Sequence, residues 1–460
     1  MTRPATAEAL DALTTIVGRG HVLAEPDLRA GYEIDWTRRF GGPAVAVVRP
    51  ADTAQVGAVV RWAVEHGVVL VPQGGNTGMV GGGVPPAATA DGRPVVVVSV
   101  RRLDAIGEPD LVAGQITVGA GVTLATVHER VSGTGWAFGV DLGARDSATI
   151  GGMVATNAGG VRVLRHGSMR HQVLGVEAVL GDGSVVSRLG GLVKDNTGYD
   201  LAGLLCGSEG TLGLVTAVRL RLVPDPPDRV LVVAALPDVT TALVIAARLR
   251  AEVDAIDALE ATLDGGADLA CDQLGIARPF DPMPPVLLLV EWAGRAAPPD
   301  ALGTALDDWP TVAADDARGR AALWGPRERM AEAIARVGIP HKLDVTLPLA
   351  RLAEFTTEVR RVVASVFPDA RLFLFGHLGD GNLHVNIVGP APDDERVDDV
   401  VLGLVAAMHG SISAEHGVGR AKARYLGLNR SPAELAAFAA IKRALDPAGV
   451  LNPGVILPVA

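Results

Sequence analysis

The stretch PQGGNTGMVGG at residues 72–82 is the part of this sequence that most narrows the fold. It begins inside a predicted apolar strand, 68–75, and the five positions 74–78 are all glycine, asparagine or threonine. Such residues tolerate left-handed backbone, so several N–H groups can point into one concavity. The stretch predicts a nest for a pyrophosphate, with a plain glycine-rich turn as the alternative. It is neither a Walker loop nor a GxGxxG fingerprint.

Two further glycine-rich segments strengthen this interpretation. The first, DLGARDSATIGGMVATNAGGVRVLRHGSMR at 141–170, sets short polar side chains among two Gly-Gly pairs. The second, KDNTGYDLAGLLCGSEGTLGLVT at 194–216, repeats the theme. The polar side chains can bond phosphate or a ring amide, and the glycines let the backbone come close to a ligand. One such segment is weak evidence, whereas three in the same half of the chain favour a phosphate-bearing cofactor.

Length and composition limit the other possibilities. A chain of 460 residues predicts two or three domains. Its 41 basic and 52 acidic residues give a net charge of −11 without a basic stripe, which argues against a nucleic-acid partner. Only Cys206 and Cys271 are cysteines, which favours a reducing compartment. Residues 1–17 do not resemble a signal peptide, and no apolar run reaches the ~20 residues of a membrane span, so we expect a cytoplasmic protein without integral membrane association.

Hydrophobic patterning predicts the order of the main elements. The first 40 residues look helical, and from Pro43 onward the pattern is that of alternating strands and helices. Asp182-Gly183 suits the tight turn of a hairpin over 176–187. Asp225-Pro226-Pro227 marks a domain boundary. We expect further strands at 44–50, 94–100, 115–123, 211–227 and 285–294, and helices at 53–67 (capped by Asp52 or Thr53), 239–253, 316–336, 348–366, 395–409 and 431–445.

A different signal lies in GHLGDGNLHVNI at 376–387. The segments 371–377 and 383–389 predict an antiparallel pair joined by GDGN. His377 precedes this turn and can therefore return beside His384. For each histidine alone, a capped or core position is the more common explanation. As a pair separated by glycine turns, they favour a metal site.

The segment AEHGVGR at 414–420 supplies the remaining groups. Two imidazoles and the carboxylate of Glu415 are the ligand set of an open zinc-type site. The adjacent His416 is left to move a proton, although it and His409 are competing ligands. Asn386 lies two positions after the second histidine on the predicted strand, so the two side chains share a face.

The order of these segments resembles the FAD-linked oxidoreductases of the vanillyl-alcohol oxidase/p-cresol methylhydroxylase superfamily, and most of all their D-2-hydroxyglutarate/D-lactate dehydrogenase group. The resemblance runs from about Asp35 to LNPG at 451–454. It implies an α+β fold with a PCMH-type two-lobed FAD-binding domain at 1–226. A substrate domain with an antiparallel sheet and the metal site would occupy 227–425, and the segment 426–460 would return to the FAD-binding domain.

The resemblance also implies which residues hold FAD. Some relatives tether FAD through a histidine in the first glycine loop, and this loop has none, so non-covalent FAD is expected. The family pattern assigns a pyrophosphate cradle, a second cofactor wall, an adenosine side and a flavin contact from the C-terminal tail. In that order these residues are Gly74, Gly75, Asn76, Thr77, Gly78 and Met79; Ser147, Gly151, Gly152, Thr156, Asn157 and Gly159; Glu209, Gly210 and Val215; and Asn452.

For the second site the resemblance selects His377, His384 and Glu415 as ligands of zinc or manganese, and His416 as the base. The implied reaction oxidises a D-2-hydroxy acid to the 2-oxo acid. The metal lowers the pKa of the substrate hydroxyl, His416 takes its proton, and the hydride passes to flavin N5. The alternatives are a metal-independent flavin oxidase and a flavoprotein subunit of a glycolate-oxidase-like complex. The implied electron acceptor is an electron-transfer flavoprotein or a quinone-linked carrier, and a homodimer is an open alternative for the oligomeric state.

The segment 324–345 matches the family's substrate helix and supplies Arg327 and Lys342, with Asn386 as a further substrate contact. The alternative explanation for Arg327 and Lys342 is that they belong to a solvated helix face. Arginine can bind a carboxylate through two parallel hydrogen bonds, which lysine cannot. The hydroxyglutarate enzymes carry a threonine four residues after this arginine, where the chain has Ala331. The missing hydrogen bond would cost ~1–3 kcal/mol, which leaves room for D-lactate or a bulkier apolar D-2-hydroxy acid.

Overall fold

The computed structural model describes residues 7–458, so the expectation for residues 1–6 lies outside it. The chain forms two compact units. Unit 1 consists of residues 7–159, Gly167–Pro224 and 415–458, and unit 2 of Gly160–His166 and Asp225–Ala414. The chain passes between the units after residues 159, 166, 224 and 414, whereas the boundaries expected from the sequence are at 226 and 425.

The first sheet of unit 1 combines parallel and antiparallel pairs. Its order is β1 (Val22–Leu23), β2 (Ala46–Val48), β4 (Val95–Ser99) and β3 (Val69–Gln73), and β2 and β3 both run parallel to β4. The crossover helix α3 (Thr53–His66) begins where the Asp52 carboxylate accepts a hydrogen bond from the Gln55 N–H at 2.8 Å. It ends at Gly67, whose φ of 63° suits glycine. Both caps confirm the predicted helix.

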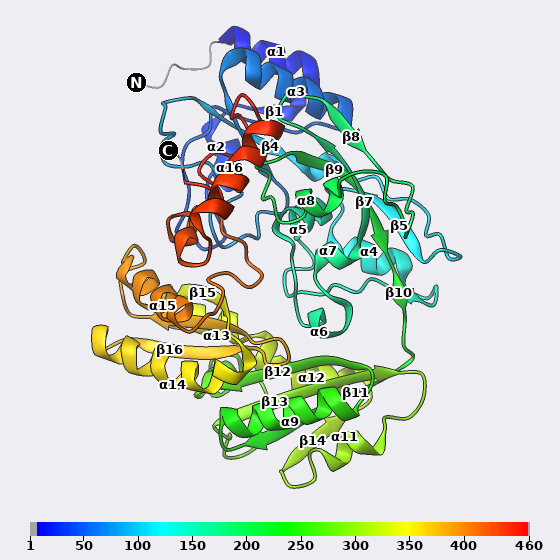
Figure 1. Cartoon of the computed structure of the whole chain (residues 1–460), viewed down its shortest axis with the longest axis vertical. Helices are drawn as coiled ribbons and strands as arrows, with labels where there is room; N and C mark the ends of the chain where they lie inside the picture. The colour runs from blue at the N-terminus through cyan, green and yellow to red at the C-terminus, as the bar shows by residue number, and fades with distance from the viewer. Residues whose placement is uncertain (1–6, 459–460) are drawn as a thin grey trace. The chain divides into compact units, whose positions relative to one another are not determined.

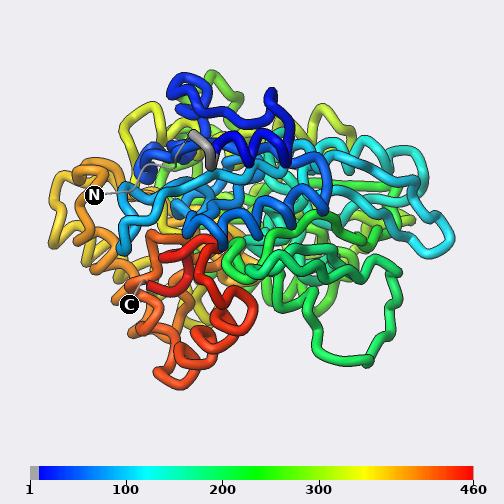
Figure 2. The backbone as a smooth tube through the Cα atoms, turned by 90° about the horizontal axis from the view of Figure 1, so that it is seen from above, coloured from blue at the N-terminus to red at the C-terminus, as the bar shows by residue number. Residues whose placement is uncertain are grey.

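The second sheet of unit 1 is antiparallel throughout. Its order is β5 (Gln115–Gly119), β9 (Leu214–Arg221), β7 (Val173–Val179) and β8 (Val185–Ser187). The predicted hairpin is confirmed, because β7 and β8 turn at Asp182 and Gly183. The loop of residues 188–200 after β8 extends outward in Figure 2, and Tyr199 in it is 99% exposed. A short pair, β10 (Val223–Pro224) with β6 (Trp136–Ala137), completes the strands of this unit.

The N-terminal region corrects one expectation. Helix α1 (Ala7–Val17) ends at Gly18, where φ is 87°, and the chain then alternates short helices with β1. The first 40 residues are therefore not one helical region, because glycine ends the helix early. Before the C-terminal segment, the other helices described in unit 1 are α2 (Pro26–Arg29), α4 (Leu124–Val131), α5 (Ile150–Thr156), α7 (Met169–Gln172), α8 (Leu201–Leu205) and the 3₁₀ turns Arg19–His21, Ala30–Tyr32 and Val100–Arg102.

The C-terminal segment contributes to the first sheet of unit 1. After the turn Ala423–Leu428, α16 (Pro432–Leu445) starts with a capping box between Ser431 and Glu434. The chain then runs alongside β3, where Leu451 forms a parallel bridge with Leu70. Asn452 follows directly, and its N–H donates to the Leu70 carbonyl at 2.9 Å. The tail is thereby fixed beside the strand that leads into the first glycine loop.

Unit 2 is built on a seven-stranded sheet with every pairing antiparallel. Helix α9 (Val239–Glu252) packs against β11, β12 and β13 (Figure 1). Every residue of β12 and β13 is buried. The order is β14 (Thr311–Ala314), β11 (Asp228–Leu236), β13 (Val286–Gly294), β12 (Ile256–Leu263), β16 (Arg371–His377), β17 (Asn382–Val388) and β15 (His341–Thr346).

The helix predicted over 316–336 is two helices, α12 (Ala317–Glu328) and α13 (Met330–Val337), which meet at Arg329. Gly325 and Pro326, both weak helix formers, precede this break. The helices predicted at 239–253, 348–366 and 395–409 are confirmed with small shifts of their ends. The other helices of unit 2 are α6 (Val163–His166), α10 (Gly266–Leu274), α11 (Asp300–Thr304), α14 (Leu349–Val366) and α15 (Arg396–Ala407).

The segment Gly160–His166 belongs to unit 2 although its neighbours in sequence belong to unit 1. Arg165 donates to the Asp257 carboxylate and to the Ala293 carbonyl, both at 2.8 Å, and Arg162 lies 3.4 Å from the same carboxylate. Burial alone would raise the pKa of Asp257, but His166 and these arginines hold it below its usual value. A buried acid thus fixes the short segment to the sheet.

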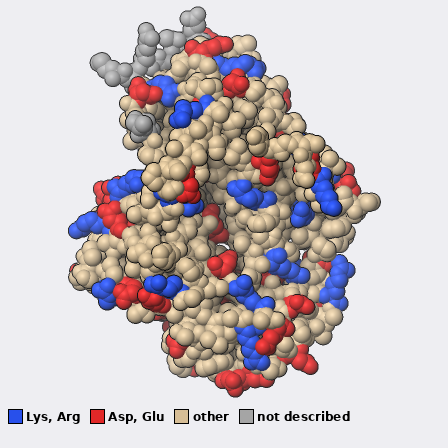
Figure 3. Space-filling view, viewed as in Figure 1, with Lys and Arg blue, Asp and Glu red and all other residues tan. Residues whose placement is uncertain are grey.

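The surface and the cysteines agree with a globular protein of mixed charge. Basic and acidic side chains are interspersed over the face in Figure 3, without a broad basic patch there. Cys206 and Cys271 are both buried, and neither forms a disulfide. Among the helices that the structure describes, none combines the length and apolar character that crossing a membrane requires.

Candidate active site

Four neighbouring strands of the unit 2 sheet gather polar side chains on one face. Residues that face each other in an antiparallel pair point to the same side of the sheet, and so do residues two apart along a strand. The register therefore collects side chains from β12, β16, β17 and β15. The facing pairs are Glu260 with His377, Phe375 with His384, Asp344 with His384, and Lys342 with Asn386.

His384 is held from two sides. Its Nδ1 lies 3.4 Å from Oδ1 of Asp344, and its ring centroid is 5.0 Å from that of Phe375. Asp344 is fully buried, and Asn382 donates its amide N–H to the same Oδ1 at 2.7 Å. The carboxylate and the ring therefore restrict how the imidazole can turn.

His377 is held by a buried carboxylate, Glu260, which also binds Arg327. His377 Nδ1 is hydrogen-bonded to Oε1 of Glu260, while the Arg327 guanidinium donates to Oε2 at 2.6 and 2.9 Å. Burial alone would raise the pKa of Glu260, but His377 and Arg327 hold it below its ordinary value. An ionised carboxylate accepts the Nδ1–H of the imidazole, so this network assigns the lone pair of His377 to Nε2.

The chain after α15 is paired with β15. Thr346 and Ser411 form an antiparallel bridge, and the Ala414 N–H donates to the Asp344 carbonyl at 3.3 Å. Glu415 is the next residue of the chain. The position of its backbone is therefore set by the hydrogen bond between Ala414 and the strand that carries Asp344.

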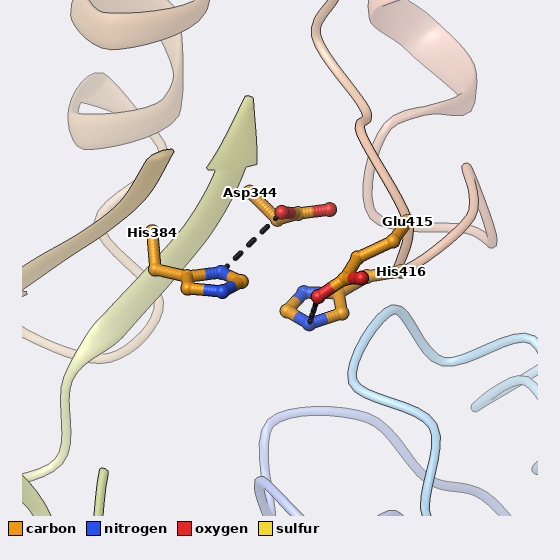
Figure 4. Close-up of side chains that lie close together, drawn as sticks. All are labelled: Asp344, His384, Glu415 and His416. Carbon is orange, nitrogen blue, oxygen red and sulfur yellow. Dashed lines mark ion pairs between the residues drawn. The ribbon is translucent and has the colours of Figure 1, made fainter. Parts of the chain in front are cut away.

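Asp344, His384, Glu415 and His416 form a group whose potential ligand atoms lie within 4.8 Å of one another. Figure 4 shows these side chains gathered around one space. The group contains three residues predicted from the sequence and adds Asp344. Imidazole nitrogens and carboxylate oxygens are donors that suit zinc and, with more oxygen, manganese. The donor chemistry thus fits a divalent cation.

His377 is a neighbour of this group and not a member of it. Its ring centroid is 5.4 Å from that of His384, and the two rings meet edge to face at 78°. The assignment of His377 as a ligand stays a prediction, because the structure brings its ring next to one proposed ligand without joining the four clustered atoms.

The predicted substrate contacts lie on the same face of the sheet. Lys342 and Asn386 stand opposite each other on β15 and β17. Burial lowers the pKa of Lys342 to about 8, and Asn386 is 2% exposed. Arg327 lies over the Phe375 ring, 4.6 Å from its centroid. Two cations and an amide therefore lie at this face of the sheet.

In unit 1 the first two glycine segments touch through their backbones. A Cβ atom at Gly74 would collide with the Thr149 hydroxyl, and one at Gly75 would collide with the Ser147 carbonyl. Thr149 also begins α5, where its hydroxyl accepts the Gly152 N–H at 3.3 Å. Glycine is required for this close approach, and the two segments predicted to hold one cofactor do lie together.

The asparagines of these segments shape the loops. Asn76 and Asn157 both have left-handed backbone, with φ of 56° and 51°. The Asn76 amide donates to the Ile34 carbonyl at 2.9 Å, and the Asn157 side chain accepts the Arg170 N–H at 2.9 Å. Of the other predicted cofactor residues, Gly151, Gly159, Glu209, Gly210, Val215 and Asn452 are buried, whereas Gly74, Gly75, Thr77, Gly78, Met79, Ser147, Gly152 and Thr156 keep solvent-accessible surface.

Sequence reasoning missed two acids, and each had a signal. Asp344 stands two positions after Lys342 on a strand, so the period of two already put both side chains on one face. Glu260 is an acidic residue in the otherwise mostly apolar strand 256–263. A charge at a buried position needs a charged or hydrogen-bonding partner, so a buried acid indicates a polar site inside the fold.

Comparison with known families defines the class of protein. An FAD binding domain family matches residues 44–188, and the C-terminal domain family of FAD linked oxidases matches residues 225–456. The first match includes the two glycine segments that touch in unit 1, and the second includes the sheet with the clustered histidine and acids. These matches define an FAD-linked oxidoreductase.

Individual relatives narrow the family. The chain is 37% identical to the D-2-hydroxyglutarate dehydrogenase of Xanthomonas citri pv. viticola, over 94% of this chain and 93% of that protein. It is 36% identical to the mitochondrial D-2-hydroxyglutarate dehydrogenase of Bos taurus, over 98% of this chain and 83% of that protein. The chain therefore belongs to the D-2-hydroxyglutarate dehydrogenase group of the vanillyl-alcohol oxidase/p-cresol methylhydroxylase superfamily, as its motifs predicted.

Solved structures confirm the fold. A p-cresol methylhydroxylase with substrate bound superposes with a TM-score of 0.75 at 17% identity, over 98% of this chain and 96% of that chain. An alkyldihydroxyacetonephosphate synthase superposes with a TM-score of 0.76 at 15% identity, over 98% of this chain and 87% of that chain. The predicted PCMH-type α+β fold is thus the fold of the protein.

Proposed function

We propose that this chain is an FAD- and divalent-metal-dependent dehydrogenase that oxidises a D-2-hydroxy acid to the 2-oxo acid. One observation carries the proposal: potential ligand atoms of Asp344, His384, Glu415 and His416 lie within 4.8 Å of one another in a member of an FAD-linked oxidoreductase family. Oxidation of an alcohol requires loss of a hydroxyl proton together with a hydride. Imidazole and carboxylate groups that hold a cation can assist the loss of the hydroxyl proton.

The proposed metal ligands are His377, His384 and Glu415, with Asp344 as the alternative to His377. Zinc or manganese fits this donor set. A divalent ion bound there supplies positive charge that lowers the pKa of a coordinated hydroxyl. The hydrogen bond that Glu260 accepts from His377 Nδ1–H supports the assignment of His377, because it favours the lone pair on Nε2.

The proposed base is His416. Its Nε2 lies 3.9 Å from Oε1 of Glu415, so the base and a proposed ligand are neighbours. A neutral imidazole can take the proton of the substrate hydroxyl near neutral pH. Non-covalent FAD, when bound to the glycine segments of unit 1, supplies the acceptor of the hydride. Reoxidation by an electron-transfer flavoprotein or a quinone-linked carrier is proposed on the family resemblance alone.

The substrate is proposed to bind through its carboxylate groups. Arg327 and Lys342 supply positive charge and Asn386 an amide on the face of the sheet that carries His384. The names of the relatives make D-2-hydroxyglutarate the first candidate. Ala331, where the family pattern has a threonine, lacks one hydrogen bond, which would weaken the grip on that acid by ~1–3 kcal/mol. D-Lactate is therefore the second candidate.

A dye-reduction assay with the D and L forms of 2-hydroxyglutarate and lactate tests the function. Activity should be confined to the D forms. A chelator should abolish it, zinc or manganese should restore it, and the flavin absorbance should persist throughout. Full activity of metal-free protein would instead establish the metal-independent flavin oxidase, and an inactive but fully loaded protein would favour the subunit of a larger electron-transfer complex.

Two substitutions separate the proposed roles. His384→Ala should remove nearly all activity while FAD is retained. Arg327→Lys keeps a cation beside Glu260 but loses the guanidinium N–H groups that Glu260 does not bind, so KM should rise about 10-fold or more with little change in FAD content. The matched control is Arg329→Lys, an exposed arginine paired with Glu332 at 2.8 Å, which should leave KM unchanged. An unchanged KM in Arg327→Lys would contradict the substrate role of Arg327.

A further inference from the structure

Glu209, in the third glycine segment, hydrogen-bonds to the loop that follows His416. Its Oε1 accepts the Val418 N–H at 2.7 Å, and its Oε2 accepts the Gly419 N–H at 2.9 Å. The residue is only 8% exposed. Both carboxylate oxygens are therefore engaged by consecutive backbone N–H groups, and all three residues belong to unit 1.

Close packing leaves little freedom around this carboxylate. A Cβ atom at Gly417 would lie 2.9 Å from Oε1 of Glu209, and one at Gly82 would lie 3.1 Å from Oε2. Gly417 and Gly419 also have left-handed backbone, with φ of 86° and 54°. The loop can take this path only because glycines stand next to the carboxylate.

Arg420 fastens the same loop to the end of the first glycine segment. Its guanidinium donates to the carbonyls of Gly81 and Val84, and its own N–H donates to the Val80 carbonyl at 2.9 Å. Asn452 completes the network, because its Oδ1 accepts from the Arg420 guanidinium at 3.2 Å and its amide donates to the Glu209 carbonyl at 2.9 Å. The loop is thus bonded to three segments that are far apart in sequence.

This arrangement accounts for an acid in a segment predicted to line a phosphate-bearing cofactor. A carboxylate facing a pyrophosphate would be repelled by like charge. Here the carboxylate faces backbone N–H groups, with Arg420 and Lys422 close enough to lower its pKa. Burial outweighs them and raises the pKa of Glu209 to about 7. The two carboxylate oxygens are used by the backbone of the loop that follows His416.

We infer that Glu209 is a positioning residue, which fixes the loop 417–420 and through it the placement of Glu415 and His416. This inference rests on the proposed function, since those two residues are the proposed ligand and base. Glu209 acts through the backbone N–H groups of Val418 and Gly419. One residue of the third glycine segment would thereby set the geometry of the proton-transfer and metal groups.

Glu209→Gln is the direct test. Glutamine keeps the shape and one acceptor oxygen, but its NH₂ group opposes the other backbone N–H. At equal FAD content kcat should fall about 10- to 100-fold, while KM stays within about 3-fold. The kinetic isotope effect with substrate deuterated at C2 should rise, because the chemical step becomes slower. A lower fraction of folded enzyme would reduce kcat without changing this isotope effect.

A second readout does not depend on activity. A chromogenic chelator should withdraw zinc from Glu209→Gln about 3-fold or more faster than from the wild-type protein, because Glu415 is held less firmly. Gly82→Ala is the second variant, since its backbone tolerates alanine and its Cβ would press on Oε2 of Glu209. It should change both readouts in the same direction and by less.

Glu177→Gln is the matched control. Glu177 is a glutamate of β7 in the same unit, and it accepts hydrogen bonds from Thr53 and Ser187. Its substitution should lower the Tm but leave kcat, the isotope effect and zinc release unchanged. The inference is overturned if Glu209→Gln keeps wild-type values of all three, or if it loses FAD in proportion to activity. A wild-type protein that oxidises no 2-hydroxy acid would overturn the proposed function only, and zinc release would still decide the role of Glu209.

Discussion

Glu260 is a buried carboxylate that joins two residues with separate predicted roles, His377 and Arg327. One oxygen faces the imidazole and the other faces the guanidinium. Glu260 therefore both balances the charge of Arg327 and orients the ring of His377. Its effect on the site is indirect, because Arg327 offers an anion only those N–H groups that Glu260 does not already bind.

Glu260→Gln should destabilise the protein strongly. Glutamine cannot balance the buried Arg327 charge, and breaking a buried ion pair in this way costs about 3–5 kcal/mol of unfolding free energy. Denaturant unfolding of the two proteins at neutral pH measures the difference. Glu332→Gln removes an exposed partner of Arg329 and Arg336 and should cause no measurable change. Equal stability of Glu260→Gln and the wild-type protein would show that the pair contributes nothing.

Lys342 predicts a dependence of substrate binding on pH. Burial lowers its pKa to about 8 from the ordinary 10.5, so the ammonium is present below that pH and lost above it. A substrate carboxylate binds the charged form, and KM should therefore rise by up to about 10-fold per pH unit above 8. In Lys342→Met, KM should be high at neutral pH and should lack this rise. A wild-type KM that stays flat up to about pH 10 would contradict the role.

At the scale of elements, the hairpin of β16 and β17 determines where the two histidines lie. Its register faces His377 with Asn382, and it places Phe375 opposite His384. The turn between the strands depends on Gly381, whose φ is 82° and whose Cα has no room for a side chain beside the Leu347 carbonyl. A change in this turn should therefore move His377 as well as lower stability.

Gly381→Ala tests the turn. Left-handed backbone costs a non-glycine residue about 1–2 kcal/mol, and the added Cβ would also collide with the Leu347 carbonyl. Unfolding free energy should fall by at least that amount, and kcat should fall with it. Gly403→Ala in α15 meets no neighbour within 4 Å and should instead gain about 0.5–1 kcal/mol. A neutral Gly381→Ala would mean that the turn can rearrange.

The elements were largely predictable, and the tertiary contacts were not. Asp52 and Gly67 mark both ends of α3 in the sequence, and the alternation in β16 and β17 predicts their pairing. The contact between Glu209 and Val418 joins residues far apart in the chain, and no local pattern encodes it. The same holds for Asp344, which joins Glu415 and His416 only through the fold.

At the scale of the whole molecule, cofactor and metal are expected to stabilise the protein independently. The predicted FAD residues are distinct from the proposed metal ligands, of which His377 and His384 lie in unit 2 and Glu415 lies in unit 1. FAD at about 100 times its Kd should add about 2.7 kcal/mol to the unfolding free energy. Thermal unfolding should show the same gain in chelator-treated protein. A gain that disappears with the metal would reveal coupling between the two ligands.

The placement of Gly160–His166 in unit 2 bears on how such an enzyme can be recombined. The backbone changes units after residues 159, 166, 224 and 414. Splicing unit 2 from a relative would thus need four junctions. A hybrid that exchanges only residues 225–414 would set the relative's residue at position 257 opposite this chain's own Arg162 and Arg165. Parents that differ at those arginines should yield few viable chimaeras unless the segment Gly160–His166 is exchanged together with the sheet of unit 2.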